Sequence, residues 1–119
     1  MKKIIYLVPV LAILAGALPA MADAAAGEAL FNGAGKCKNC HKTTDKKKVG
    51  PGLAGAVSRG GEEWIKAFLK DPQAVWTADE GYTKTLKAAV NNTKPKPKHK
   101  TRQLTDDEIQ ALLDYLKTL

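Results

Sequence analysis

Two cysteines and a histidine stand within five consecutive residues, Cys37-Lys38-Asn39-Cys40-His41, and their types and spacing suit them to hold a metal cofactor. The order C-x-x-C-H is the spacing used for covalent attachment of a c-type haem. Two thiols separated by two residues on one turn can form thioether bonds to the two vinyl groups of one porphyrin. The adjacent imidazole then lies under the iron as its proximal ligand. The motif therefore predicts haem c, attached through Cys37 and Cys40 and ligated by His41.

Three other uses of these residues are open, and each lacks a feature that it needs. A redox C-x-x-C of the thioredoxin kind follows a strand in a βαβ pattern, whereas residues 24–35 are Ala-rich and predict a helix. A zinc site would combine the motif with His99, but structural zinc ligands usually come as two separated pairs. A disulfide between Cys37 and Cys40, the ordinary expectation in an oxidising compartment, leaves His41 without a role. The pattern favours haem attachment.

The elements expected to position this motif are helices, so the predicted fold class is all-α. No segment alternates apolar and polar residues long enough for a convincing strand, and no repeat or domain linker interrupts the chain. Apolar periodicity and stop signals predict helices at about 25–32, 62–70 and 83–90. A capping box at residues 105–108 predicts a last amphipathic helix. Prolines and lysines between residues 91 and 103 exclude a regular helix there.

The connections between these helices carry signals of their own. Asp71-Pro72 is expected to end the second helix. Trp76 and Tyr82 lie on the approach to the third helix, and core packing is favoured over direct haem contact for both. The glycine- and proline-rich segment 49–53 predicts a shaped loop after the haem motif.

The first 22 residues have the layout of a secretory signal peptide rather than of a folded domain. The charged start Lys2-Lys3 precedes an apolar run that is short for a membrane span, and small residues stand at positions 20 and 22. Cleavage is expected after Ala22, with Ala24 as the second choice. Residues 23–119 would then form one small domain, with too little apolar interior to be generously stable without its cofactor.

The chain is basic, and the charge narrows the class of partner. The net charge of the 119-residue chain is +7, and removal of Lys2 and Lys3 with the signal would leave +5. Charge of this sign fits a nucleic acid, an anionic membrane surface or an acidic protein. After export a nucleic acid is an improbable partner, so we expect an acidic protein.

Residues 23–119 resemble the class I c-type cytochromes, the monohaem cytochrome c family, over essentially their whole length. Three features carry the likeness: the C-x-x-C-H motif behind a short helix, Gly50-Pro51-Gly52-Leu53 after a variable loop, and residues 104–109 at the start of the last helix. The resemblance implies a small cytochrome c fold, with helices wrapped around one haem and the first and last helices crossing. It also implies that the Pro51 carbonyl accepts a hydrogen bond from the His41 ring, which would strengthen the imidazole as an iron donor.

One departure from the family concerns the sixth iron ligand, which is generally a methionine in the loop before the last helix. The only methionines here are Met1 and Met21, both in the predicted signal. His99 stands at the spacing from the last helix that the family gives to the methionine, so His99 is the expected sixth ligand. Three alternatives stay open: a solvated surface histidine, ligation by a deprotonated lysine of segment 94–100, and a vacant or water-filled sixth site.

Together these features predict a periplasmic electron carrier, not an enzyme, of low potential with bis-His ligation. The alternative is a haem-based sensor or small-ligand-binding cytochrome with an open or weakly held sixth site. The expected partners are redox proteins with acidic docking surfaces, guided by lysines near the haem edge. We expect a monomer without a membrane span after signal cleavage, and no contact with nucleic acid.

Overall fold

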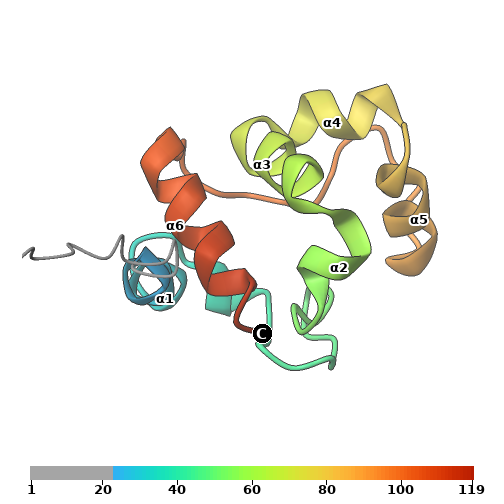
Figure 1. Cartoon of the computed structure of the whole chain (residues 1–119). Helices are drawn as coiled ribbons and strands as arrows, with labels where there is room; N and C mark the ends of the chain where they lie inside the picture. The colour runs from blue at the N-terminus through green and yellow to red at the C-terminus, as the bar shows by residue number, and fades with distance from the viewer. Residues whose placement is uncertain (1–22) are drawn as a thin grey trace, which may run out of the picture.

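The computed structural model describes residues 23–119, which form six α-helices and one short 3-10 helix with no β-strand (Figure 1). The predicted all-α class is therefore confirmed. Among these residues, no helix has both the length and the apolar character needed to span a bilayer. The predicted signal peptide, residues 1–22, lies outside the described residues, so cleavage after Ala22 stays a prediction.

Helices α1 (Ala24–Asn32) and α6 (Asp106–Leu116) cross and make the most extensive helix contact of the fold (Figure 1). Gly27 lies at the crossing, where a Cβ atom would overlap the Ala111 carbonyl and lie 2.8 Å from Tyr115 Cβ. Only glycine allows the two helices to approach so closely. Beside it, the Phe31 and Tyr115 rings meet edge to face with their centroids 5.5 Å apart. The crossing confirms what the resemblance implied.

The start of α6 is set by the predicted capping box. Thr105 Oγ1 accepts from the Glu108 amide at 3.2 Å, and Glu108 Oε2 accepts from the Thr105 amide at 3.1 Å. The apolar face of the helix that follows joins two clusters of buried side chains. The first holds Phe31, Leu104, Ile109 and Leu112, and the second holds Ile65, Leu113 and Leu116.

The middle of the chain supplies α2 (Ala56–Gly60), α3 (Glu62–Lys70), α4 (Pro72–Ala78) and α5 (Tyr82–Ala89). The predicted helices 62–70 and 83–90 are confirmed as α3 and, within one residue, α5. Helix α4 was not predicted, because the pattern Asp71-Pro72 is typical of a helix end. The Asp71 carboxylate accepts from the Ala74 amide at 3.0 Å, and Pro72 occupies the first helical turn, so this pair also begins a helix. The five residues of α2 are too few to show helical periodicity.

Residues 91–103 connect α5 to α6 without a regular helix, as predicted, and the segment runs past α4 and α3 (Figure 1). Two side chains of α4 hold its first half. Trp76 Nε1 donates to the Lys94 carbonyl at 2.8 Å, and Gln73 Nε2 donates to the Pro95 carbonyl at 3.1 Å. This long connection carries His99 to the interior of the domain.

Candidate functional site

The C-x-x-C-H motif folds as a single tight turn directly after α1. Cys37–Asn39 form the 3-10 helix η2, and Lys36 enters it with a left-handed φ of 54°. The amides of Cys40 and His41 both donate to the Cys37 carbonyl, at 3.1 and 3.0 Å. The turn therefore brings both thiols and the imidazole to the wall of one cavity. Burial raises the pKa of the Cys37 thiol.

The His41 ring is held from behind by the loop that the sequence singled out. Its Nδ1 lies 2.8 Å from the Pro51 carbonyl oxygen. A carbonyl can only accept, so Nδ1 carries the proton and Nε2 keeps its lone pair for a metal. Gly50 packs against the same ring, where a Cβ atom would lie 2.5 Å from His41 Cε1. The Gly50 amide donates to the Cys40 carbonyl at 2.8 Å, which ties the loop to the motif.

His99 lines the same cavity and stands on the segment before α6. The His41 and His99 ring centroids are 6.1 Å apart, with 46° between the ring planes. The edge of the His99 ring meets Phe68, with centroids 4.9 Å apart. Burial, with a smaller contribution from the neighbouring His41, lowers the pKa of His99 to about 4. His99 is therefore neutral near pH 7, as a metal-binding imidazole must be.

All five residues predicted for the site line one cavity of about 250 Å³: Cys37, Cys40, His41, Pro51 and His99. The opposite wall is aromatic, formed by Trp64, Phe68, Trp76 and Tyr82. Trp64 stacks on Phe68 with centroids 4.9 Å apart and meets Tyr82 edge to face at 4.8 Å. Facing imidazoles, two free thiols and a largely apolar wall are the donors and the dry environment that a covalently attached haem requires.

The zinc alternative finds no support in this geometry. Within residues 23–119 no group of three or more histidine, cysteine or carboxylate side chains is arranged to hold a metal ion. Two imidazoles, with ring centroids 6.1 Å apart, and two thiols line the same cavity. This arrangement suits a planar cofactor between the rings rather than a tetrahedral ion.

Several wall residues were not predicted as part of the site. Trp76 is 3 % exposed and Trp64 is partly buried, and both also line the cavity. For these two tryptophans, packing in the core and lining the cavity are therefore not alternatives. Arg59 also reaches the cavity wall, and its guanidinium donates to the Gly52 carbonyl at 2.8 Å. No sequence signal marks Arg59, because α2, which carries it, was itself missed.

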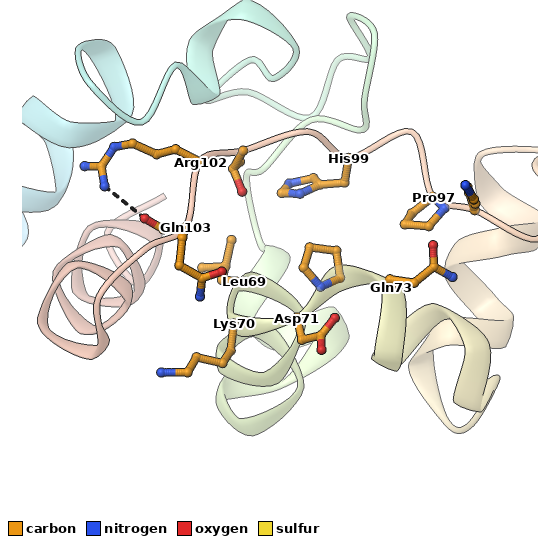
Figure 2. A pocket seen from close by; sticks show the side chains of 11 residues that line it. Leu69, Lys70, Asp71, Gln73, Pro97, His99, Arg102 and Gln103 are labelled. Carbon is orange, nitrogen blue, oxygen red and sulfur yellow. Dashed lines mark hydrogen bonds between the residues drawn. The ribbon is translucent and has the colours of Figure 1, made fainter.

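A smaller pocket of about 240 Å³ lies on the outer side of His99 (Figure 2). Figure 2 shows the His99 ring at its rim, with Leu69 on one side and Pro97 and Gln73 on the other. The His99 Nδ1 atom is buried and has no hydrogen-bond partner within residues 23–119. His99 lines both this pocket and the main cavity.

Comparison with known proteins places these features in a family. The cytochrome c family model matches residues 24–119. A cytochrome c2 of Rhodospirillum rubrum is 36 % identical, with the match covering 91 % of this chain and 89 % of the relative. A second cytochrome c2 of the same species is also 36 % identical, over 82 % of this chain and 97 % of the relative.

Solved structures agree with this placement. A cytochrome c from Rhodothermus marinus superposes with a TM-score of 0.64 at 26 % identity, covering 82 % of this chain and 76 % of that protein. An engineered cytochrome c from the same organism, bound to a carbene intermediate, gives a TM-score of 0.63 at 27 % identity, with the same coverage of both chains. The chain belongs to the cytochrome c family of electron carriers, and its cofactor is a covalently bound haem c.

Proposed function

We propose that this cytochrome is an exported, low-potential electron carrier of the periplasm, in which His41 and His99 are the two axial iron ligands. Residues 1–22 would direct export, and residues 23–119 would be the working domain. The observation that carries the proposal is that two imidazole rings line one cavity with their centroids 6.1 Å apart.

The ring separation can be compared with what one iron between two histidines requires. A metal–imidazole bond of about 2 Å on each side, plus about 1.1 Å from each bonding nitrogen to its ring centre, gives about 6.2 Å between centres. The observed 6.1 Å agrees with this value. A surface histidine in a basic loop has no reason to lie at this distance from His41, so the separation supports ligation by His99.

Haem c supplies one-electron transfer between ferric and ferrous iron when it is bound. The chain's own residues would fix its position and its potential. Cys37 and Cys40 would hold it by thioether bonds, and the Pro51 carbonyl would orient His41 and raise its donor strength. An axial methionine raises the potential of a c-type haem. Residues 23–119 contain no methionine, so a His41–His99 pair would keep the potential low.

The surface beside the motif supports docking to an acidic redox protein. Val49 borders the cavity and is 62 % exposed, an unusual position for a large apolar side chain. Six exposed lysines lie near it in the chain, on the same loop or in and directly before η2: Lys36, Lys38, Lys42, Lys46, Lys47 and Lys48. An apolar centre within a basic rim suits brief contact with a partner, because long-range attraction speeds encounter while the small apolar contact allows release.

The axial ligands are tested by the absorption spectrum of the purified ferric holoprotein. We expect a low-spin haem without the charge-transfer band of a methionine–iron bond. His99→Ala should become high-spin, because it loses the sixth ligand. A matched change at the exposed Lys98, Lys98→Ala, should keep the low-spin spectrum. A low-spin His99→Ala protein would instead point to a lysine of the same segment as the ligand.

Export is tested separately by fractionation of cells that express the full chain. The proposal predicts that haem-stained protein appears in the periplasmic fraction with an N-terminus at Asp23. Holoprotein that keeps Met1 and stays with the cytoplasmic fraction would contradict export without affecting the ligand assignment.

A further inference from the structure

We infer that His99 is a displaceable ligand, and that a neutral diatomic gas such as carbon monoxide takes its place on the ferrous iron. The inference rests on the proposed function, because it assumes that His99 is the sixth ligand. Three independent features of the structure support it: an imidazole nitrogen without a partner, a segment without hydrogen bonds, and a pocket that can receive the ring.

The two imidazoles differ in the hydrogen bonds that support them. His41 Nδ1 donates to the Pro51 carbonyl at 2.8 Å. His99 Nδ1 is buried and has no partner among residues 23–119. A histidine ligand normally donates its second N–H to a carbonyl, carboxylate or water, which raises its basicity. With Nε2 as the ligating atom, His99 would lack this support at Nδ1, and its bond to iron would be the weaker of the two.

Burial of the unpartnered nitrogen also favours the displaced state. An unsatisfied buried polar group disfavours the state in which His99 is bound to iron. It shifts the equilibrium between the bound and displaced states by about 5- to 150-fold. When His99 leaves the iron, Nδ1 can reach water and this cost disappears. Release of His99 is therefore easier than release of a histidine whose second nitrogen is already bonded.

The segment that carries His99 is poorly held. Within the described chain, no hydrogen bond involves any residue from 96 to 101. The nearest anchors are the bonds to the Lys94 and Pro95 carbonyls from α4. Few buried hydrogen bonds and low contact density are the marks of segments that open locally at small cost. The segment can therefore move without unfolding α5 or α6.

The outer pocket offers a place for the displaced ring. It shares four lining residues with the main cavity: Leu69, Pro97, His99 and Thr101. The His99 ring already lines this pocket of about 240 Å³ (Figure 2), so the ring could enter it when displaced. The site left behind is bordered by Phe68 and Leu69, whose apolar side chains suit a neutral diatomic molecule better than an anion.

The exchange itself is a simple substitution. The His99 imidazole would give up its bond to the ferrous iron, and the carbon atom of carbon monoxide would bind there instead. No electron or proton is transferred, and no other reactant is needed. Carbon monoxide serves as the probe because its binding changes the haem spectrum directly.

The test is stopped-flow mixing of reduced holoprotein with carbon monoxide. The parent should bind with a rate that levels off as the gas concentration rises, because release of His99 becomes limiting. His99→Ala should bind with a rate that stays proportional to concentration. Amide hydrogen exchange of residues 96–101 in the holoprotein should be faster than that of α6, whichever ligand is bound.

A pair of glutamine variants tests whether the segment controls release. Gln73→Ala removes the bond to the Pro95 carbonyl and should raise the limiting rate by about fivefold. Gln110 donates to Asp114 within α6 and lines neither pocket, so Gln110→Ala should leave the limiting rate unchanged.

Two results would overturn the inference, and they are distinguishable. A low-spin parent that shows no carbon monoxide spectrum after hours at saturating gas would refute displacement while leaving His99 as the ligand. A parent spectrum that is unchanged in His99→Ala would refute the ligand assignment, and the inference with it.

Discussion

Gly50→Ala should weaken the proximal side of the haem site, because the added methyl group has no room beside the His41 ring. Its Cβ would lie 2.5 Å from His41 Cε1 and 3.0 Å from Nδ1. Carbon atoms in contact are normally about 3.5–4.0 Å apart. The ring or the loop must therefore move by about 1 Å, and the 2.8 Å bond from Nδ1 to the Pro51 carbonyl would lengthen beyond hydrogen-bond range.

Two contributions set the expected size of the effect. Overpacking typically destabilises by about 1–3 kcal/mol, and the lost hydrogen bond adds about 0.5–1.5 kcal/mol. The Gly50 amide and carbonyl are both hydrogen-bonded, to Cys40 and Lys48, so the loop cannot relax freely. We expect the free energy of unfolding of the ferric holoprotein to fall by about 2–4 kcal/mol.

The same change should raise the reduction potential. A weaker donor at His41 stabilises ferric iron less, so the ferrous state becomes more stable relative to the ferric state. A loss of about 0.5–1 kcal/mol in ferric stabilisation corresponds to about 20–40 mV for a one-electron couple. Guanidinium unfolding and potentiometric titration measure the two effects, with Val49→Ala on the same loop as the control. A Gly50→Ala protein with the parent's stability and potential would show that the ring does not depend on this contact.

Three further predictions follow from the same structure. Cys37→Ser and Cys40→Ser should each greatly reduce covalently bound haem, seen by haem staining after denaturation, and normal staining of both variants would contradict thioether attachment. Electron exchange with an acidic partner should slow as ionic strength rises, because opposite charges are screened, and an unchanged or faster rate would exclude electrostatic steering. Arg102 lowers the pKa of Glu108 through a hydrogen bond, with a smaller contribution from the Thr105 amide. A carboxylate whose pKa is lowered by folding stabilises the protein at pH values above the pKa that it has in the unfolded chain. That stabilisation is lost as the pH falls through its pKa in the folded protein. The Tm difference between the parent and Arg102→Gln should therefore be small but measurable at pH 7, since the pair is exposed, and absent in strong acid. A difference that persists after Glu108 is protonated would argue for another cause.

Local signals in the sequence were sufficient for much of the fold. α3 and α6 were predicted from apolar periodicity and a capping box, both of which act within a few residues. α4 was missed because Asp71-Pro72 has two roles, as the end of one helix and the start of the next. α2 is shorter than two helical turns, so its pattern is not distinct from that of a loop.

In the site, too, features that depend on neighbouring residues could be predicted from the sequence, whereas features that depend on tertiary packing could not. Two thiols and an imidazole within five residues specify a cofactor by their order alone. The distance between His41 and His99 depends instead on how the segment 91–103 passes α4, which is a matter of tertiary packing. The pocket beyond His99 and its unpartnered Nδ1 arise from that packing too, so neither has a sequence signal.

The most direct test of the proposed ligand pair is the reduction potential of the parent compared with that of His99→Met. If His99 binds iron, a thioether in its place should raise the potential, because sulfur favours the electron-rich ferrous state relative to a second imidazole. The methionine–iron charge-transfer band should appear in the same variant. Equal potentials in the two proteins, with no new band, would mean that the side chain at position 99 is not an iron ligand.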